Sequence, residues 1–556
     1  MFPKVLFFKS IVYFLCRILF GKLRSNNARG LHRSGSNLAH SRYQNFSSIN
    51  TIKPDLTNRT VVFDLEGALL RSSSPFPYFM LVALEAGSFM RALLLLLTYP
   101  LVAFLSDEWG LKVMAFVSFF GVKVRGLRVG SAVLPKFFLE DVGLESFEVL
   151  KRSGRKVVVS CLPQVMIEDF AREYLEVDAV MGREMRVICG RFLGVMEEEN
   201  QMFKRSGSTM VPAINGGEEE LLPSLREDDA CGIGNNGGVV GLSSLKKILL
   251  HPHIFSHCKD LYIVGRADKG SFRQLPAQEA PKPVIFHDGR LAFLPAPLSV
   301  VALFMWAPFG VLLSVLRIAI GLTMPYGLSI PILCFSGLQY TVWNPTSVTT
   351  PGTPERKSVK GSLFVCNHRT LLDPLCLSFS LKKDLTAVTY SLSRVSEILS
   401  PIRTVRLTRD RVKDGAMMES LLRRGDLVVC PEGTTCREPY LLRFSPLFTE
   451  MSDDIIPVAV DTSVAWFHGT TAGGLKCFDP LFFFLNPNPI YELRLLEKVS
   501  RLSMAGHQDE EKSRFDVAND VQGRIGQALG FGCTGLTRKD KYMILAGNEG
   551  IVGNKR

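Results

Sequence analysis

One short stretch constrains the fold of the second half of this chain more than any other. Leu363 to Cys366 is an apolar run that predicts a buried strand, and Asn367 and His368 follow it directly. Asp373 lies five residues after His368, so its carboxylate can return to the imidazole as the chain turns into the next helix. A carboxylate on Nδ1 would fix the tautomer and leave Nε2 to take a proton from a hydroxyl. The pair therefore predicts a base that activates an alcohol, with a capping Asp beside a structural histidine as the alternative.

The length and charge of the chain limit its organisation. At 556 residues it is too long for a single hydrophobic core, so we expect two or three domains. It carries 65 Lys and Arg against 53 Asp and Glu, a net charge of +12, but the opposite charges are interleaved. This pattern disfavours nucleic acid as a partner and favours anionic lipid headgroups or phosphorylated substrates such as coenzyme A esters. The twelve cysteines form no CxxC pair, which is typical of reduced thiols facing the cytosol.

The N-terminal segment, residues 1–54, has a targeting or anchoring composition. It contains no Asp or Glu and several Arg and Ser residues, which is typical of a mitochondrial transit peptide. Residues 5–20 are rich in Phe, Leu and Ile but are interrupted by Lys9 and Arg17, which suits an interfacial membrane helix better than a span. From these residues, membrane anchoring and mitochondrial import are equally good predictions.

Two later regions are apolar enough to contact a membrane. The segment 78–121 is divided by Pro100 and an acidic pair, and it fits either a helical hairpin in one leaflet or a buried helical cap of its domain. Leu298 to Leu322 contains a single charge, Arg317, near its end, where a long side chain can reach the membrane interface. A second apolar piece, residues 327–337, follows. Together the two predict a re-entrant or paired membrane helix.

A polar tetrapeptide precedes that membrane helix. His287-Asp288-Gly289-Arg290 follows a Pro-rich segment, residues 276–283. The residue types could be catalytic, but a turn at a domain boundary explains them more simply. We therefore predict a structural role for this turn.

The first half of the chain contains two motif-like strands. Thr60 to Leu70 predicts a buried strand that leads into Asp64 and Glu66, and Lys156 to Cys161 predicts a second that contains Ser160. They resemble the first two motifs of the haloacid-dehalogenase (HAD) phosphatases. There the first Asp of Asp-x-Asp accepts the phosphoryl group, the second is the general acid, and the serine binds phosphate. Glu66 stands where the second Asp belongs, and a displacement of about an ångström can cost about a hundredfold in rate.

The remaining HAD motifs are degenerate. The family's last motif supplies magnesium-binding aspartates, and we place it at residues 230–238, which contain Asn235, Asn236 and Gly238 instead. Amides and a glycine make a poor Mg²⁺ site. No clear match for the family's motif-three lysine is visible. The resemblance therefore implies that residues 55–290 keep a HAD-like α/β fold, with 78–121 as an insertion, and hold no metal and no phosphatase activity.

Three more blocks follow the His368–Asp373 pair. They are a strand within residues 402–410 that leads to Arg409, a strand within 426–435 that delivers Glu432, Gly433 and Thr434 to a loop, and a strand within 454–460 that contains Pro457. The four blocks in this order resemble the signature of the glycerolipid acyltransferases. That signature is Asn-His-x4-Asp, an apolar strand ending in Arg, Pro-Glu-Gly-Thr, and an apolar-Pro-apolar strand. The conjunction of all four makes a chance pairing of His368 with Asp373 a poor explanation.

The resemblance implies a role for each block. His368 would be the catalytic base and Asp373 its orienting partner, Arg409 would bind the substrate phosphate, Glu432, Gly433 and Thr434 would hold the glycerol moiety, and Pro457 would shape the acyl or coenzyme A channel. Acyl-CoA would be a co-substrate, and no metal or redox cofactor is expected. The cysteines near these blocks are predicted to be packing residues.

A HAD-like half followed by this acyltransferase half resembles the land-plant glycerol-3-phosphate sn-2 acyltransferases. The resemblance implies an α/β protein with a basic segment (1–54), a HAD-like domain (55–290), membrane-associated helices (291–344) and an acyltransferase domain (345–556). It also implies an enzyme of the endoplasmic reticulum membrane, with the mitochondrion as alternative. Its product would be lysophosphatidic acid, in glycerolipid and cutin or suberin synthesis. The alternatives are a lysophospholipid acceptor and, from a different class, a phosphatase.

Overall fold

The computed structural model describes residues 45–48, 56–125, 127–197, 239–250, 255, 258, 260–282, 285–343, 361–389, 394–408, 410–452, 454–500 and 510–548. The chain divides into two compact units. The first unit consists of residues 1–283 and 294–301, and the second of residues 284–293 and 302–556. The turn at His287–Arg290 therefore belongs to the second unit, ahead of the long apolar helix in the sequence.

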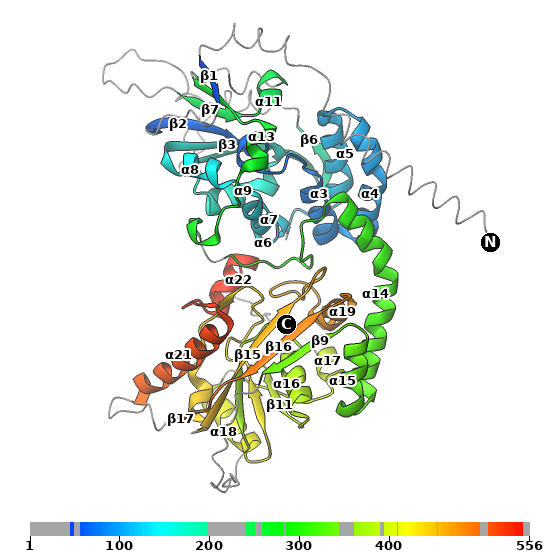
Figure 1. Cartoon of the computed structure of the whole chain (residues 1–556), viewed down its shortest axis with the longest axis vertical. Helices are drawn as coiled ribbons and strands as arrows, with labels where there is room; N and C mark the ends of the chain where they lie inside the picture. Colours follow the sequence, from blue (N-terminus) through cyan, green and yellow to red (C-terminus); the bar gives the residue numbers. More distant parts are fainter. Residues whose placement is uncertain are drawn as a thin grey trace, which may run out of the picture. The chain divides into compact units, whose positions relative to one another are not determined.

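The first unit is built on a six-stranded parallel sheet in the order β1-β8-β7-β2-β3-β4 (Figure 1). The strands are β1 (Asn45–Ser48), β2 (Leu56–Asp64), β3 (Ser153–Pro163), β4 (Ala179–Arg183), β7 (Val240–Ser243) and β8 (Asp260–Ile263). The strands predicted around Asp64 and Ser160 are thus confirmed as β2 and β3. Val61, Phe63 and Val158 are completely buried, as expected for a parallel sheet covered on both faces.

Helices surround this sheet, and a separate two-stranded hairpin lies between β4 and β7 in the sequence. The helices are α6 (Val129–Ala132), α7 (Leu134–Asp141), α8 (Leu144–Arg152), α9 (Gln164–Tyr174), α11 (Leu245–Leu250) and α13 (Arg266–Ser271), and the hairpin is β5 (Met185–Ile188) with β6 (Arg191–Met196). Because β2, β3 and β7 are parallel neighbours, their carboxyl ends meet at one edge. Asp64, Ser160 and Ser243 lie together there.

The predicted insertion at residues 78–121 is helical. It contains α3 (Phe76–Val82), a π-helical turn (Ala83–Gly87), α4 (Phe89–Phe104) and α5 (Asp107–Phe119), and Ser88 and Ser106 cap the starts of α4 and α5. Helix α3 is fully buried, whereas α4 buries only Ala92 and Leu95. The opposite face of α4 exposes five large apolar side chains, at Met90, Leu94, Leu97, Leu101 and Phe104. The insertion is therefore a cap on one side and an uncovered apolar helix on the other.

The second unit is built on a larger sheet in the order β12-β11-β13-β10-β15-β16-β9, with β17 paired to β15. Its strands are β9 (Gln339–Trp343), β10 (Leu363–Cys366), β11 (Thr386–Thr389), β12 (Arg403–Arg406), β13 (Leu427–Val429), β15 (Asp454–Ser463), β16 (Ile490–Leu495) and β17 (Val499–Ser500); β14 (Tyr440–Leu441) pairs separately with β18 (Gly532–Cys533). The pairs are parallel except where β15 meets β16 and β17. The four strands predicted for the acyltransferase blocks are confirmed as β10, β12, β13 and β15.

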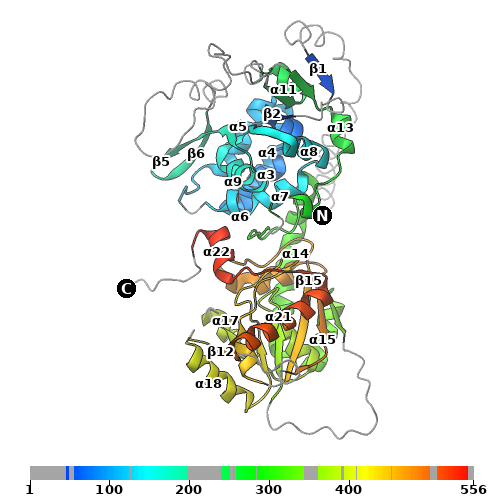
Figure 2. The same ribbon diagram turned by 90° about the vertical axis from the view of Figure 1, so that its left-hand side faces the viewer.

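Helices cover both faces of this sheet (Figures 1 and 2). They are α15 (Tyr326–Phe335), α16 (Asp373–Leu381), α17 (Arg394–Ile398), α18 (Arg411–Leu422), α19 (Asp479–Leu485), α21 (Glu510–Leu529) and α22 (Arg538–Ala546). Leu363 and Val365 of β10 pack on the side of α18 and α21, and Phe364 and Cys366 pack on the side of α16 and α19. Alternate side chains of β10 therefore belong to two hydrophobic cores, one on each face of the sheet, and the carboxyl end of the strand lies between these cores.

The long apolar helix predicted at Leu298–Leu322 is α14 (Pro297–Thr323). Within the described part of the chain it is the one helix long and apolar enough to cross a membrane. One of its faces is nevertheless polar and docked on the second unit. Trp306 Nε1 donates to the carbonyl of Leu485 at 2.8 Å, and Ser314 Oγ donates to that of Leu481 at 2.8 Å.

Arg317 extends that polar face and corrects one prediction. Its side chain is completely buried and does not reach outward to an interface. The guanidinium donates to the carbonyls of Phe484 and Asn486, both at 2.7 Å, to that of Pro487 at 3.0 Å, and to Ser336. A buried guanidinium needs hydrogen-bond acceptors of this kind, because burying a cation without partners costs free energy. The apolar residues Met305, Phe309, Leu312, Val315 and Leu316 remain exposed on α14.

Candidate active site

The end of β10 is fixed by its neighbours before the chain reaches His368. Asn367 is completely buried, and its side-chain amide pairs with the backbone of Val460 in β15, donating at 2.9 Å and accepting at 2.7 Å. The backbone N–H of His368 donates to Glu432 Oε1 at 2.8 Å, and its carbonyl accepts from Cys436 N–H at 2.6 Å. The loop after β13 therefore holds the backbone of His368 on both sides, β15 holds the preceding Asn367, and the histidine side chain stays 15% exposed.

Asp373 lies beside that histidine, as the sequence spacing predicts. It is the first residue of α16, and its Oδ2 is 2.8 Å from His368 Nδ1. The fully buried carboxylate also accepts from the backbone N–H of Arg369 at 2.7 Å and of Thr370 at 3.0 Å, and from the Thr370 hydroxyl at 2.9 Å. Tyr491 OH is a further donor. Because the carboxylate is held on all sides, it orients the imidazole with Nε2 turned away from it.

The Pro-Glu-Gly-Thr loop follows β13 and packs against the same turn. Glu432 is buried, and its Oε2 accepts from Leu442 N–H at 3.0 Å while Oε1 accepts from His368 N–H. Burial raises the pKa of the Glu432 carboxyl to about 7, although these backbone donors oppose the shift. Both oxygens thus contact the backbone, so Glu432 braces the loop against His368. Its expected role in holding glycerol stays a prediction.

Gly433 and Thr434 continue the loop. Gly433 has a φ of +68°, a conformation that favours glycine, and its N–H donates to the carbonyl of Cys430 at 3.2 Å. Thr434 is buried directly after it. Gly433 and Thr434 form a tight turn, and the loop that contains them lies beside His368. No contact in the structure tests whether either residue binds substrate.

Pro457 lies inside β15, where a proline is unusual. It pairs with Val365 on the parallel side, and its carbonyl accepts from Leu496 N–H at 2.9 Å. On the antiparallel side β16 pairs only as far as Val458 and β17 pairs at Asp454 and Ile455, so the missing N–H of Pro457 falls where the partner strand is interrupted. The proline explains the break between β16 and β17. Its proposed part in a substrate channel stays untested.

The predicted phosphate ligand, Arg409, lies outside the described residues. Its described neighbours are Thr408, whose N–H and hydroxyl bind Asp414, and Asp410, which caps α18. Two other arginines of the block form ion pairs: Arg406 with Glu397 at 2.7 Å and Arg411 with Glu450 at 2.5 Å.

Residues outside the four sequence blocks also form hydrogen bonds that hold the loops around the site. The turn at His287–Arg290 is structural, as predicted, because the Asp288 carboxylate accepts the backbone N–H groups of Thr471, Ala472 and Gly473 at 2.7 to 2.8 Å. From α22, the fully buried Lys541 donates to the carbonyl of Thr435 at 2.8 Å. Nothing local in the sequence signals these contacts, since their partners are more than a hundred residues away.

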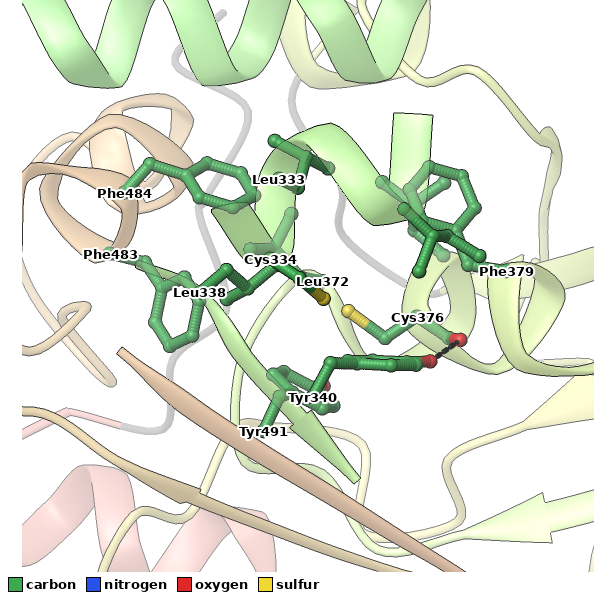
Figure 3. Close-up of a pocket in the computed structure, with 12 residues that line it drawn as sticks. Leu333, Cys334, Leu338, Tyr340, Leu372, Cys376, Phe379, Phe483, Phe484 and Tyr491 are labelled. Carbon is green, nitrogen blue, oxygen red and sulfur yellow. Dashed lines mark hydrogen bonds between the residues drawn. The ribbon is translucent and has the colours of Figure 1, made fainter. Parts of the chain in front are cut away.

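An apolar pocket is lined by Tyr340, Tyr491 and the side chains around them (Figure 3). Its cavity volume is only about 20 Å³, so its own side chains fill most of the space between the lining elements. Its lining comes from α15, β9, α16, α19 and β16: Ile330, Leu333, Cys334, Leu338, Tyr340, Leu372, Leu375, Cys376, Phe379, Phe483, Phe484 and Tyr491. Tyr491 belongs both to this lining and to the donors of Asp373, so pocket and dyad share a wall.

The HAD-like motifs meet at the sheet edge of the first unit, but in a different arrangement from the prediction. Asp64 ends β2, Glu66 follows it, and Ser160 on β3 donates to Glu66. The residue next to Asp64 on the adjoining strand is Ser243, which donates to it at 2.5 Å. Asn235, proposed for that place, lies outside the described residues. A hydroxyl at the end of β7 is no better a magnesium ligand than an amide.

Sequence reasoning also missed a lysine at this edge. Lys247 Nζ lies 2.8 Å from Asp64 Oδ1 and 2.5 Å from Glu66 Oε2. Burial alone would raise the pKa of Glu66, but the Lys247 ammonium lowers it to about 2. The two consecutive lysines after β7, Lys246 and Lys247, are the sequence feature that could have predicted a cation at this edge. A Mg²⁺ ion does not fit a pair of carboxylates that already bind an ammonium.

Comparison with known proteins agrees with this division of the chain. The model of the HAD-like domain of glycerol-3-phosphate acyltransferase RAM2-like proteins matches residues 60–264, and the acyltransferase model matches residues 348–461. The fold and the dyad thus define an acyltransferase with a HAD-like N-terminal domain. The predicted α/β fold class is confirmed.

The relatives specify the family. The chain is 51% identical to probable glycerol-3-phosphate acyltransferase 3 of Arabidopsis thaliana over 556 residues, covering 99% of each chain. It is 51% identical to probable glycerol-3-phosphate acyltransferase 2 of the same plant, covering 90% of this chain and 91% of that one. For glycerol-3-phosphate acyltransferase 1 of this plant the identity is 47%, covering 90% and 84%. The chain belongs to the plant glycerol-3-phosphate acyltransferase family.

Proposed function

We propose that this chain transfers the acyl group of an acyl-CoA to a hydroxyl of glycerol 3-phosphate, giving lysophosphatidic acid and free coenzyme A. The observation that carries the proposal is the contact of His368 Nδ1 with Asp373 at 2.8 Å, in a chain about half identical to named glycerol-3-phosphate acyltransferases. His368 follows the end of β10, Asp373 begins α16, and buried hydrogen bonds hold both in place.

The geometry supports direct acyl transfer without a nucleophilic side chain. His368 Nε2 takes the proton of a glycerol hydroxyl while that oxygen attacks the thioester carbonyl carbon, and a C–O bond forms. Collapse of the tetrahedral intermediate breaks the C–S bond, and the leaving thiolate takes the proton back from the imidazolium. Asp373 orients the ring throughout and stabilises its positive charge. General acid–base catalysis of this kind contributes about 10²- to 10⁴-fold. The mechanism needs no metal or redox cofactor, with acyl-CoA as co-substrate.

The proposed path of the acyl chain runs along the apolar lining of the pocket around Tyr340 and Tyr491, whose side chains must move apart to admit it because the cavity holds only about 20 Å³. Its lining is aliphatic and aromatic. One of the lining residues, Tyr491, also donates a hydrogen bond to Asp373. A chain held there would bring its thioester toward the dyad, because the pocket and the carboxylate share α16. Chain-length preference would then depend on side chains such as Phe379 and Phe484.

The proposed acceptor phosphate ligand is Arg409, because a guanidinium fork binds two phosphate oxygens at once. Arg409→Ala should raise the KM for glycerol 3-phosphate more than it lowers kcat, since it removes binding rather than chemistry. Arg411→Ala is the matched control, because that arginine is engaged with Glu450. An unchanged KM in Arg409→Ala, or a larger increase in Arg411→Ala, contradicts the assignment.

One assay tests the proposed function and separates it from the runner-up. Membranes containing the protein are incubated with labelled glycerol 3-phosphate or a lysophospholipid, and with plain and ω-oxidised acyl-CoAs. The expected product is lysophosphatidic acid acylated at sn-2, formed only from glycerol 3-phosphate and absent with His368→Ala. Acylation of the lysophospholipid alone would replace the proposal with the alternative acceptor. Use of ω-oxidised donors would support the proposed role in cutin or suberin.

We also propose residence in the endoplasmic reticulum membrane, with the mitochondrion as alternative. The support is α14, with apolar side chains exposed along one face, in a family of enzymes that handle lipids. Imaging of a full-length fluorescent fusion with markers for the two organelles distinguishes them, and a diffuse signal contradicts both.

A further inference from the structure

Two lysines lie beside the carboxylates at the HAD-like edge of the first unit. Lys247 on α11 contacts both carboxylates of the Asp64–Glu66 pair, at 2.8 and 2.5 Å. A second ammonium, that of Lys269 on α13, donates to the backbone carbonyl of Glu66 and is buried. Two carboxylates therefore face two ammonium groups, and the cluster of Asp64, Glu66, Lys247 and Lys269 is neutral overall.

Every carboxylate oxygen of this cluster is already occupied by donors. Asp64 Oδ1 accepts from Lys247 and from Gly67 N–H at 2.9 Å, and Oδ2 accepts from Ser243 at 2.5 Å. Glu66 Oε2 accepts from Lys247, and Oε1 accepts from Ser160 and from Leu162 N–H at 3.3 Å. The oxygens that could ligate a cation or attack a phosphate are thus engaged by donors built into the chain.

We propose that the Lys247 ammonium takes the place that a divalent cation holds in phosphatases of this fold, so that the HAD-like domain is complete without metal. Together with Lys269, the covalently attached Lys247 ammonium balances the charge of the two carboxylates at all times, whereas a bound ion does so only when it is present. Mg²⁺ also demands near-octahedral oxygen coordination at about 2.1 Å, which the lysine prevents. The domain is then a metal-independent scaffold rather than a phosphatase awaiting its ion.

Removing the lysine should reverse this arrangement. In Lys247→Ala the buried carboxylates lose the one ammonium that contacts both of them, and Lys269 alone cannot balance their charge, which leaves a pair of oxygen ligands suited to a hard cation. Lys246→Ala is the matched control, because this neighbouring lysine contacts Asp107 on α5 instead. The double variant Asp64→Asn/Lys247→Ala lacks one of the two carboxylates and reports cation binding elsewhere on the protein.

The experiment uses the full chain, purified in detergent and stripped with EDTA. Bound Mn²⁺ is measured by electron paramagnetic resonance, and the thermal unfolding temperature is measured with and without Mg²⁺. We expect wild type and Lys246→Ala to bind no Mn²⁺ beyond the double variant and to show no Mg²⁺-dependent shift. Lys247→Ala should unfold at a lower temperature in EDTA, bind one further Mn²⁺, and regain stability with Mg²⁺.

Two outcomes would overturn the proposal. One is stoichiometric Mn²⁺ binding by wild type that disappears in Asp64→Asn, because the ion then coexists with the lysine. The other is a Lys247→Ala protein that folds but neither binds Mn²⁺ nor responds to Mg²⁺. The wild-type measurement decides the matter even if Lys247→Ala does not fold. None of these readouts involves acyl transfer, so they are independent of the proposed activity.

Discussion

At the scale of single residues, the carboxylate of Asp373 accepts more hydrogen bonds than its pairing with His368 alone would predict. Its carboxylate accepts from His368, from two backbone N–H groups, from Thr370 and from Tyr491. Such a network fixes the imidazole before substrate arrives, which avoids reorganisation during the reaction. Because each donor holds the same carboxylate, the residues around it act as a unit.

Asp373→Asn should therefore lower kcat at least about a hundredfold while the protein still folds. An amide in this place can donate to Nδ1, which favours the tautomer with its proton on Nε2, and that tautomer cannot accept a proton there. His368→Ala should cost as much, and the double variant should lose little more, because the two residues act together. The control is Asp384→Asn, three residues beyond the end of α16. Near-wild-type turnover by either single variant would refute the mechanism.

Glu432 gives a second residue-scale prediction, for stability against pH. Its pKa in the folded protein is about 7, above its ordinary value of 4.5, so the folded state binds this proton more tightly than the unfolded state. The contribution is fully present below pH 4.5 and is lost as the pH rises to about 7. Since one pKa unit is worth about 1.4 kcal/mol, the loss is on the order of a few kcal/mol.

Glu432→Gln removes this titration. The difference in unfolding free energy between wild type and Glu432→Gln should change between pH 4.5 and 7 in favour of the variant, and should be constant above that range. Denaturant unfolding of the two proteins across the range measures it. A difference that is independent of pH would show that Glu432 does not hold its proton in the folded state.

At the scale of elements, α14 combines two surfaces that its sequence does not separate. Trp306, Ser314 and Arg317 lie at helical spacing and bind the backbone carbonyls around α19. The opposite face exposes large apolar residues. A helix docked in this way is part of the acyltransferase domain, and its exposed face is the part left to contact lipid.

Arg317→Met should destabilise the protein by about 2 to 4 kcal/mol, because four buried carbonyls lose their donors at once. Ser314→Ala removes one hydrogen bond and should cost about 1 kcal/mol. Leu316→Met, on the exposed face, should be within about 0.5 kcal/mol of wild type. Thermal unfolding in detergent compares the three. If Arg317→Met unfolds like Leu316→Met, the guanidinium contributes nothing to docking.

At the scale of the whole molecule, two potential catalytic centres occur in one chain, and their chemistry differs. The dyad in the second unit has an imidazole that is partly open to solvent, whereas the Asp64–Glu66 cluster in the first unit is neutralised by lysines. The chain as a whole is therefore expected to acylate an acceptor and leave its phosphate in place.

The full chain should release no phosphate from lysophosphatidic acid or a generic phosphomonoester, with or without Mg²⁺. The reason is that both Asp64 oxygens are engaged, by Lys247 and Ser243. Phosphate release is followed beside acyl transfer in the same preparation, so that an inactive sample is recognised. Turnover that requires Mg²⁺ and is abolished by Asp64→Asn would mean that the domain is a working phosphatase.

The sequence by itself determined the local elements of this protein and the order of its motifs. The strands at β2, β3, β10 and β15, the long helix α14, and the nearness of His368 to Asp373 all depend on residues close together in the chain. Apolar periodicity and a spacing of five residues are enough to predict them. The resemblance to two families followed from the same local motifs.

Only the tertiary structure decided which distant groups complete these motifs. Tyr491 reaches Asp373 across 118 residues, and Lys247 reaches Asp64 across 183. The same holds for Arg317, whose partners near α19 turn an expected surface charge into a buried one. Neither composition nor spacing specifies such pairs, because the packing of the sheets and helices brings them together. The chemistry of each site, active or silenced, depends on that packing.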